Sequence, residues 1–573
     1  MPVHNSEIAD AFEQIADLLE IKGANPFRTR AYRNASRTVS SLSSQIHTLL
    51  AEGEDLTELS DIGADLAGRI EEFVKTGEMT LLEELKEEIP AGLLDLFKVE
   101  GLGPKKIKKL YEELDITTLA ELKKAAESGK ITRLEGFGEK TTEKILTNLE
   151  KVENREERFL LSAVEQQAYP LIDVLEEVTG VDQVEIAGSF RRRRDSVGDL
   201  DLLVTADDSG PVMKEFTNYE DVVEVLAEGE TKASVVLRSG LQVDLRVVKK
   251  ESWGAALLYF TGSKEHNVAL RGMAGDRDLK INEYGVFSGE DCLGGYTEKE
   301  IYRILDCDYI EPELRENRGE LQAAREGGLP ELVSKEDMKG DLQSHTPGSD
   351  GKNSLEEMAE AARARGYEYL AITDHSDYLA VAGGLDSDGL KKQGEKIDEL
   401  NQNWDDFKLL KSVEVDILPA GKLALDDEVL QELDIVSAAI HSKFDLSEKK
   451  QTRRITEALK NPYINVFVHP TGRKIVSREP YAIDLEKIME VAVEENSFLE
   501  INASPERLDL NDVQARRARE MGLKLTISTD AHSCPGLDNM RYGVGQARRG
   551  WLRKQDVLNT RSWKEIKNIL YLN

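Results

Sequence analysis

The sequence contains few cysteines and no long apolar run. Its three cysteines, Cys292, Cys307 and Cys534, form no CxxC pair, which excludes a disulfide framework and a zinc ribbon. No apolar run approaches the roughly 20 residues that span a bilayer, and the first residues lack the pattern of a secretory signal. We therefore expect a cytoplasmic protein with no membrane partner.

Basic residues are also scarce, since 75 Lys and Arg against 109 Asp and Glu give a formal net charge of −34. Such a charge ordinarily argues against a nucleic-acid partner. Two basic patches run against this trend: residues 21–51 contain no acidic residue, and residues 98–109 contain five lysines. Both patches indicate local phosphate binding, although solvated helix faces would have the same composition.

Three short segments of the first 150 residues share one pattern. Each has an apolar residue, then a glycine-containing turn, then the start of a new helix: residues 59–66, 99–107 and 134–141. Glycine lets the backbone approach a ligand, and the N–H groups at a helix start attract phosphate. A single segment of this kind is most often an ordinary helix connection. Three of them resemble helix-hairpin-helix motifs, which grip a nucleic-acid backbone without reading its sequence.

A dense polar stretch lies between two apolar runs at residues 188–201, with the sequence GSFRRRRDSVGDLD. In a strand, Asp199 and Asp201 would point to the same face, and their like charges favour a bound cation between them. The glycine turn and the arginines supply donors suited to phosphate oxygens. The stretch therefore predicts a metal-dependent nucleotide-triphosphate site. A salt bridge between the aspartates and the arginines is the structural alternative.

From this stretch onward the chain resembles the family X DNA polymerases, the DNA polymerase beta-like repair enzymes. The resemblance continues in residues 241–246, 259–263 and 281–284. It implies that Asp199, Asp201 and Asp244 are the catalytic carboxylates and hold Mg²⁺ or Mn²⁺. The implied nucleotide-binding residues are Gly188, Ser189, Arg192, Gly198, Tyr259, Phe260, Gly262, Lys264, Asn267 and Arg271.

Three residues depart from the family pattern. Gln242 stands where vertebrate members carry an arginine beside the third aspartate, and Lys264 stands where they carry an aspartate. Arg69 occupies the position of the lysine that forms a Schiff base in members with lyase activity. A guanidinium stays protonated and forms no imine, so we expect phosphate binding without lyase chemistry of the usual kind. The DNA-binding residues that the resemblance suggests are Arg28, Arg30, Tyr32, Gly63, Gly101, Gly103, Lys105, Gly136 and Gly138.

After about residue 340 the chain alternates short apolar runs with helical stretches, which predicts a parallel barrel or layered sheet. Five of the eight histidines follow such runs: His345, His375, His441, His469 and His532. Barrels place their chemistry at these strand ends. Together with Asp350, Glu414 and Asp530, these side chains suit Zn²⁺ or Mn²⁺ better than Ca²⁺.

This region resembles the polymerase-and-histidinol-phosphatase (PHP) domain, a seven-stranded β/α barrel. The family's nine ligand positions fall on Gln343, His345, Asp350, His375, Glu414, His441, His469, Asp530 and His532. Gln343 replaces the usual first histidine, and its amide oxygen is a weaker ligand. The resemblance implies two or three Mn²⁺ or Zn²⁺ ions and 3′–5′ exonuclease activity, with 3′-phosphatase and abasic-site endonuclease activity as further options.

The fold class predicted from these patterns is multidomain, with α+β and α/β parts. We expect a helical DNA-end-binding domain (1–85), a fingers-like subdomain (86–150), a nucleotidyltransferase palm with a mixed sheet (151–250), a thumb (251–315), a linker (316–338) and a PHP barrel (339–573). The partners would be gapped or primer-template DNA and deoxynucleoside triphosphates, bound by a monomer.

The leading hypothesis is a gap-filling repair polymerase with a separate exonuclease. One alternative is a DNA-end-binding scaffold whose barrel is a degenerate structural module, an option that Gln343 favours. Another is a nucleotidyltransferase for a small molecule or tRNA, which keeps the palm chemistry. That second alternative does not explain the three hairpins or the Tyr259–Phe260 pair.

Overall fold

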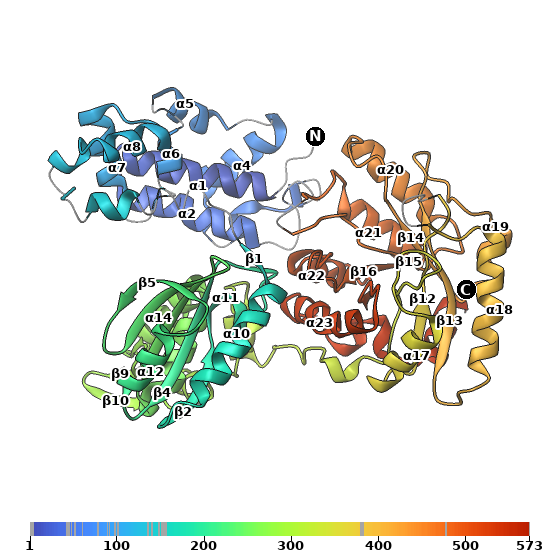
Figure 1. Ribbon diagram of the computed structural model, residues 1–573. Coiled ribbons are helices and arrows are strands. Elements are labelled where there is room, and N and C mark those ends of the chain that lie inside the picture. The colour runs from blue at the N-terminus through green and yellow to red at the C-terminus, as the bar shows by residue number, and fades with distance from the viewer. Residues whose placement is uncertain are drawn as a thin grey trace. The chain divides into compact units, whose positions relative to one another are not determined.

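The structure is a computed structural model of the whole chain (Figure 1). It describes residues 5–571 apart from gaps at 42–45, 47–48, 51–52, 60, 77–78, 89, 91, 97–98, 100–101, 135–136, 139–140, 147–148, 150–157, 379–382 and 476–477. The chain forms two compact units, Met1–Glu157 and Arg158–Asn573. Among the residues described, no helix is long and apolar enough to cross a membrane.

The first unit is helical, as its apolar periodicity predicts. Its elements are α1 (Asn5–Ile21), α2 (Pro26–Ser41), α4 (Ala64–Thr76), α5 (Thr80–Glu88), α6 (Leu93–Leu96), α7 (Pro104–Leu114) and α8 (Leu119–Glu127), with short 3₁₀ turns at Leu56–Glu58 and Ile131–Arg133. One hydrophobic core runs from Ile8 to Leu149. Residues on both sides of position 85 therefore share a core, although the sequence suggests a boundary there.

The three predicted hairpins have the same backbone geometry. In each, an apolar residue donates its N–H to a carbonyl three residues earlier: Ile62 to Leu59, Leu102 to Val99 and Phe137 to Leu134, at 3.0 to 3.1 Å. The next residue is a glycine whose carbonyl accepts the first hydrogen bond of a helical turn. The repeated pattern of apolar residue and glycine is thus a repeated turn.

The second unit begins with the palm, whose five-stranded mixed sheet has the order β2-β4-β7-β6-β5. These strands are β2 (Val181–Ile186), β4 (Asp199–Ala206), β5 (Val222–Glu228), β6 (Lys232–Leu237) and β7 (Gln242–Val248). The pair β4–β7 is parallel and the other pairs are antiparallel. A two-stranded sheet joins β1 (Phe159–Leu160) to β3 (Ser196–Val197), and the palm helices are α10 (Leu161–Glu176), α11 (Gly188–Arg191) and α12 (Ser209–Thr217).

The thumb follows with two helices and a small sheet. Its elements are α13 (Trp253–Thr261), α14 (Lys264–Gly275), β8 (Lys280–Asn282), β9 (Gly285–Ser288), β10 (Asp291–Gly294) and α15 (Glu298–Ile304). The sheet order β10-β9-β8 is antiparallel throughout. Ile281 and Val286 of this sheet pack with Leu258 and Leu270 of the helices in one cluster.

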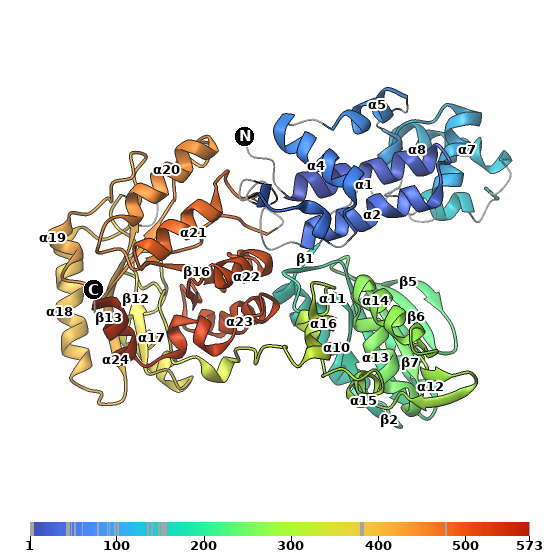
Figure 2. The ribbon, with the colours of Figure 1, turned by 180° about the vertical axis from the view of Figure 1, so that it is seen from behind.

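Residues 316–338, predicted to be a linker, are folded. They include α16 (Glu320–Glu326, labelled in Figure 2), and Glu320 is fully buried. Its Oε1 lies 2.7 Å from Nδ1 of the buried His266 and accepts a hydrogen bond from Asn317 N at 2.8 Å. The charged composition suggested a solvated segment, but several of these charges are buried in pairs.

The remaining residues form the barrel domain, a seven-stranded parallel sheet in the order β11 to β17. Its strands are β11 (Gly340–Asp341), β12 (Tyr369–Ile372), β13 (Lys408–Asp416), β14 (Ile435–Ala439), β15 (Val466–Phe467), β16 (Phe498–Asn502) and β17 (Leu525–Ser528). A parallel bridge between Ser344 and Ala531 brings the first and last strands together. The barrel is therefore nearly closed, and with the helical unit and mixed palm sheet it confirms the predicted fold class.

Helices surround the barrel and one of them covers its end (Figures 1 and 2). They are α17 (Leu355–Ala364), α18 (Ser387–Asn401), α19 (Asp427–Leu430), α20 (Glu448–Leu459), α21 (Leu485–Glu494), α22 (Asp512–Glu520), α23 (Met540–Arg549) and α24 (Trp563–Tyr571). Ile566 of α24 packs with Tyr369, Ile435 and Phe498, which begin their strands. This helix closes the N-terminal end of the barrel, so the C-terminal end is left for a site.

Candidate functional sites

The three predicted palm carboxylates lie on two adjacent parallel strands. Asp199 and Asp201 belong to β4, Asp244 belongs to β7, and Asp201 is the register partner of Asp244. Burial and the charges of Asp199 and Asp244 raise the pKa of Asp201 to about 7. Burial and the Asp244 charge also raise the pKa of Asp199. Carboxylates that repel one another in this way form a favourable site for divalent cations.

Gly188 and Ser189 begin α11, directly opposite these carboxylates. Gly188 has a φ of +63°, and a Cβ atom on it would overlap the Asp201 side chain. The turn therefore requires glycine for both its conformation and its close approach. Gly198 lies between β3 and β4, where a Cβ atom would be 3.8 Å from Arg158 Nη1.

Arg192 ends α11 and faces the turn between α13 and α14. Its Nε donates to Glu316 Oε1 at 3.1 Å, and its Nη1 donates to the Thr261 carbonyl. The same nitrogen would lie 3.1 Å from a Cβ atom on Gly262. The structure thus brings Arg192 close to Gly262, and both are predicted nucleotide-binding residues.

The other arginines of the run differ in their partners. Arg191 forms a two-point salt bridge with Glu298, with Nη1 2.8 Å and Nη2 2.7 Å from its oxygens. Arg194 Nη1 lies 3.8 Å from Glu316 Oε2. Arg191 is therefore salt-bridged to a buried thumb carboxylate, and not to Asp199 or Asp201 as the structural alternative requires.

The remaining predicted nucleotide residues lie at the α13–α14 junction. Tyr259 and Phe260 end α13 in an edge-to-face pair with ring centroids 5.1 Å apart. Lys264 is exposed at the start of α14. Asn267 Nδ2 donates to the Tyr259 carbonyl at 2.7 Å, and Arg271 Nε donates to the Asn267 carbonyl at 3.2 Å.

Gln242, which stands where vertebrate family members carry an arginine, orients the neighbouring Asp244. Its Nε2 donates to Asp244 Oδ1 at 3.3 Å along the same face of β7. A neutral donor holds the carboxylate without neutralising it. The backbone pairing of β4 with β7 places Asp244 opposite Asp201.

In the helical unit, the first hairpin borders a cavity. Arg28, Tyr32, Gly63 and Asp65 line this space of about 510 Å³, together with other residues of α2 and α4. The Tyr32 hydroxyl is buried and has no hydrogen-bond partner among the described residues. Arg69 lies on α4 with Nε 3.4 Å from Asp65 Oδ2. An unpaired donor and an arginine at a cavity suit an anionic ligand.

The other predicted DNA-binding residues are only partly described. Arg30 is exposed on α2, and Gly103 caps the start of α7. The Gly138 carbonyl accepts the first hydrogen bonds of the helical turn that follows the third hairpin. Gly101 and Gly136 lie outside the described residues, as does the side chain of Lys105. Arg33, from the same basic patch, pairs with Asp17 and Glu20 at 2.7 Å and is neutralised within the unit.

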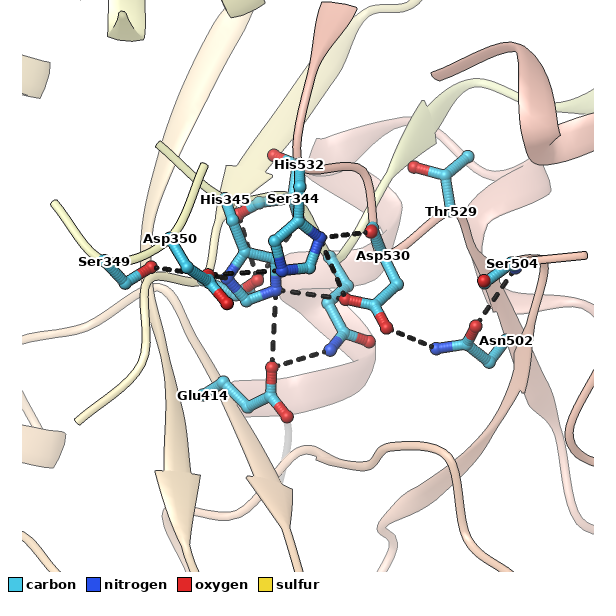
Figure 3. Close-up of polar contacts among 12 residues, drawn as sticks. Ser344, His345, Ser349, Asp350, Glu414, Asn502, Ser504, Thr529, Asp530 and His532 are labelled. Atoms are coloured by element: carbon cyan, nitrogen blue, oxygen red, sulfur yellow. Dashed lines mark hydrogen bonds and ion pairs between the residues drawn. The ribbon is translucent and has the colours of Figure 1, made fainter. Parts of the chain in front are cut away.

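The barrel domain gathers the predicted metal ligands at the C-terminal ends of its strands. His345, His375, His441, His469 and His532 follow β11, β12, β14, β15 and β17, and Glu414 lies near the end of β13. Figure 3 shows the side chains of His345, His532, Asp350, Asp530 and Glu414 turned toward one another. Most of these side chains are buried or nearly buried, and Asp350 and His532 are the more exposed ones.

The ligand atoms form three overlapping groups. In each, one atom per residue lies within 4.8 Å of the others: His345, Asp350, His375 and His532; His375, Glu414 and His441; His345, Glu414 and Asp530. His469 Nε2 adds a contact of 2.9 Å to Glu414 Oε1. His345, His375 and Glu414 each belong to two of these groups, and such shared ligands suit a site for several ions.

Electrostatics within this cluster favour a cation. The pKa of Glu414 lies well below its usual range, because contacts with several histidines outweigh burial. Burial lowers the pKa of His441, but hydrogen bonds to Asp416 and Glu414 raise it to about 9. Burial instead lowers the pKa of His375 and of His469. A metal ion would take the place of the protons on the paired imidazoles and bind the nitrogen lone pairs.

Gln343 fits the cluster as a ligand. It is fully buried, its Nε2 donates to Glu414 Oε2 at 2.9 Å, and its Oε1 has no hydrogen-bond partner among the described residues. Burying an amide oxygen without a partner is costly unless something else binds it. A metal ion would satisfy this oxygen, so the residues present fit the metal centre that the resemblance implies.

Several supporting residues escaped the sequence argument. Asp416 Oδ1 lies 3.1 Å from His441 Nδ1, Asn502 Nδ2 donates to Asp530 Oδ2 at 3.2 Å, and Arg507 Nε lies 3.6 Å from the same oxygen. Asp416 could have been found, because it lies two residues after Glu414 on the same strand face. Arg507 follows β16 in a loop with no motif to mark it.

Arg473 lies four residues after His469 in the barrel domain. Its Nε donates to the Arg507 carbonyl at 2.9 Å, its Nη1 to Asp195 Oδ2 at 3.1 Å and its Nη2 to the Leu508 carbonyl at 2.5 Å. All three nitrogens are thus engaged, and one of them reaches the palm. The guanidinium is a structural contact between palm and barrel domain.

Fold and sites together define a palm with three clustered carboxylates, joined to a barrel domain whose histidines and carboxylates could hold metal ions. Four family models match the chain: a helix-hairpin-helix domain at residues 3–79, a SAM-like helix-hairpin-helix tandem at 93–151, the DNA polymerase beta thumb at 256–316 and the PHP domain at 341–504. They match the hairpins, the thumb and the barrel domain described above.

The chain is also similar to named proteins. It is 40% identical over 575 residues, covering all of both chains, to the DNA polymerase/3′-5′ exonuclease PolX of Bacillus subtilis (strain 168). Over 232 residues, 38% of its length, the chain is 32% identical to a protein of Thermoanaerobacter sp. (strain X514) named as a probable phosphatase, and the match covers 89% of that protein. DNA polymerase lambda of Arabidopsis thaliana is 24% identical over 55% of this chain and 62% of its own length. The chain belongs to the family X DNA polymerases that carry a C-terminal PHP domain.

Proposed function

We propose that this protein is a DNA-directed DNA polymerase that fills short gaps during DNA repair, and that its barrel domain is a separate 3′–5′ exonuclease. The observation that carries the first part is the convergence of Asp199, Asp201 and Asp244 opposite the Gly188 turn. Carboxylates for metal ions beside donors for phosphates are the parts that phosphoryl transfer needs. The similarity to PolX over the full chain supports both parts.

In the palm, Asp199, Asp201 and Asp244 would hold Mg²⁺ or Mn²⁺. In the barrel domain, the nine residues from Gln343 to His532 would hold two or three Mn²⁺ or Zn²⁺ ions. When bound, such ions lower the pKa of the attacking hydroxyl or water and neutralise the phosphate charge. Arg507, next to Asp530, would add a cation for a phosphate of the DNA.

The chain's own residues would bind and orient the nucleotide. The N–H groups of Gly188 and Ser189, the Arg192 guanidinium and the Gly198 backbone would hold the triphosphate. Tyr259 and Phe260 would pack near the sugar and screen against a 2′-hydroxyl, with Gly262 allowing close approach. Asn267 and Arg271 would face the minor-groove side of the new base pair, and Lys264 would add charge near the incoming nucleotide.

The helical unit would bind the DNA backbone through its three hairpins. Arg28, Arg30 and Tyr32 would bind a 5′-phosphate beside Gly63, and Arg69 would support this binding without Schiff-base chemistry. The substrates are gapped or primer-template DNA and deoxynucleoside triphosphates. We further propose that the protein acts as a monomer in the cytoplasm, and that 3′-phosphatase or abasic-site endonuclease activity resides in the barrel domain.

A gap-filling assay tests the proposal directly. Labelled primer in a short gap is incubated with the purified protein and Mn²⁺, with and without deoxynucleotides. We expect extension with nucleotides and stepwise shortening without them. Extension without shortening, in a barrel domain that retains no transition metal, would favour the alternative in which the barrel is a structural module of a DNA-end-binding polymerase.

A further inference from the structure

One helix of the barrel domain contacts the arginine turn of the palm. Two residues of α23, one helical turn apart, lie on this face. A Cβ atom on Gly545 would lie 3.4 Å from the Arg193 Cβ, so the helix backbone approaches the turn closely. Arg549 Nη1 donates to the Arg192 carbonyl at 2.7 Å. The main chain of a triphosphate-binding residue is thus held by the exonuclease domain.

The side chain of Arg192 is tied to the same helix through one carboxylate. Glu316 Oε1 accepts hydrogen bonds from Arg192 Nε at 3.1 Å and from Arg549 Nη1 at 3.0 Å. Arg549 Nη2 donates to Asp512 Oδ2 at 2.6 Å, which anchors it to α22. Arg549 therefore contacts both the backbone and the ion-pair partner of Arg192.

Burial makes this arrangement sensitive to the loss of a single group. The Arg549 side chain is only 2% exposed, and those of Glu316 and Asp512 are 11% and 14% exposed. Removing Arg549 would take one buried cation from each carboxylate and leave Glu316 with Arg192 and Arg194, and Asp512 with Arg318. Glu316 would then compensate by binding Arg192 more strongly, in competition with a triphosphate.

We infer that Arg549 of the barrel domain is a positioning residue of the polymerase site. It orients Arg192 toward the triphosphate by donating to the Arg192 carbonyl and by pairing with Glu316, the carboxylate that also binds the Arg192 side chain. This inference rests on the proposed role of Arg192. It makes nucleotide binding in the palm depend on a helix of the exonuclease domain, although the two sets of metal ligands are separate.

Arg548 provides a matched control at the same junction. Its Nε donates to Glu313 Oε1 at 2.7 Å and its Nη1 to the Val333 carbonyl at 3.3 Å. It forms a partly buried ion pair next to Arg549, but its described contacts do not include Arg192 or Glu316. A general loss of stability at this junction would affect both variants, whereas a loss of positioning would affect only Arg549.

The experiment compares the full-length variants Arg549→Met, Arg548→Met and Arg192→Met with the wild type. Rates of gap filling are measured against dCTP concentration with Mg²⁺, and exonuclease rates are measured on single-stranded DNA with Mn²⁺. We expect Arg549→Met to raise the KM for dCTP about tenfold, with kcat changed much less and the exonuclease rate unchanged. Arg548→Met should keep the wild-type KM, and Arg549→Lys should give a partial effect, because an ammonium lacks the planar fork.

The outcomes separate the inference from the proposed function. A wild type without gap filling, or an Arg192→Met variant with the wild-type KM, would contradict the proposed function and the role of Arg192. If Arg192→Met raises the KM but Arg549→Met behaves like Arg548→Met, the inference is wrong. Should Arg549→Met be insoluble, Arg549→Lys decides by the same comparison, and a wild-type KM for dCTP in that variant overturns the inference.

Discussion

Gly188 lies against Asp201 so closely that a Cβ atom on the glycine would overlap the carboxylate. The glycine also has a φ of +63°, which L side chains rarely adopt. The predicted nucleotide turn and the predicted catalytic carboxylates are therefore in direct contact. A change at one of the two residues must displace the other.

Gly188→Ala should lower gap-filling kcat/KM about 100-fold or more, because displacements near 1 Å at reacting groups have effects of that order. Exonuclease activity should persist, since the barrel domain has its own ligands. Gly180→Ala is the matched control: it has a φ of +91° but no atom within 4 Å of its Cβ position. Equal polymerase activity of folded Gly188→Ala and wild type would contradict the predicted contact between turn and carboxylate.

Glu298 should make the thumb sensitive to acid. Despite its burial, Arg315 and Arg191 hold the pKa of Glu298 at about 2, below its ordinary value of 4.5. A carboxyl group whose pKa is lower in the folded than in the unfolded protein stabilises the fold at pH values above its unfolded pKa. This contribution is lost as the pH falls from about 4.5 toward 2. It amounts to roughly 3 kcal/mol at most.

We expect Glu298→Gln to lower the Tm at pH 7 and to differ less from the wild type at pH 3. The measurement is thermal unfolding followed by circular dichroism. Glu290→Gln, on an exposed turn, is the control and should match the wild type at both pH values. A constant difference between wild type and Glu298→Gln at the two pH values would exclude the ionised pair as the cause.

Gln343 should determine how firmly the barrel domain holds its ions. Gln343→Ala removes the unpartnered oxygen and should weaken metal binding about tenfold, an effect typical of lost supporting contacts. Gln343→His should strengthen it, because imidazole is a better ligand for Mn²⁺ or Zn²⁺. The readout is metal per chain after dialysis, measured by mass spectrometry.

Gln451→Ala serves as the control for these variants. It also removes a buried amide from the barrel domain, but from α20 rather than from the ligand cluster. Equal metal content in Gln343→Ala, Gln451→Ala and wild type would show that Gln343 is not a ligand.

Lys264 should strengthen nucleotide binding before DNA arrives. Lys264→Ala should raise the Kd for free dCTP about three- to tenfold, as expected for an exposed charge pair. Titration calorimetry measures this without DNA. Lys280→Ala, an exposed lysine on β8, makes the same charge change elsewhere on the thumb and should leave the Kd unchanged. An unchanged Kd in Lys264→Ala would refute the role.

The sequence predicted those parts of the fold that follow from local periodicity. Two-residue spacing placed Asp199 and Asp201 on one strand face, and an apolar run before each histidine located the barrel ligands. Contacts between distant residues could not be predicted. Arg473 contacts Asp195, which lies 278 residues away in the sequence, and Arg549 contacts Arg192, which lies 357 residues away.

Charge composition was misleading for a physical reason. Residues 316–338 are charged, so they resembled a solvated linker. Glu316 and Glu320 are in fact buried with cationic or histidine partners from other elements. A carboxylate alone in sequence gives no sign of such a partner.

Our central claim is that one chain holds two active sites with separate metal ligands and opposite effects on a DNA 3′ end. The most direct measurement follows labelled gapped DNA with Asp199→Ala and His469→Ala variants, in Mn²⁺ with and without deoxynucleotides. We predict that Asp199→Ala loses extension but still shortens the primer, and that His469→Ala extends but does not shorten it. Loss of both activities from either folded variant would contradict the claim.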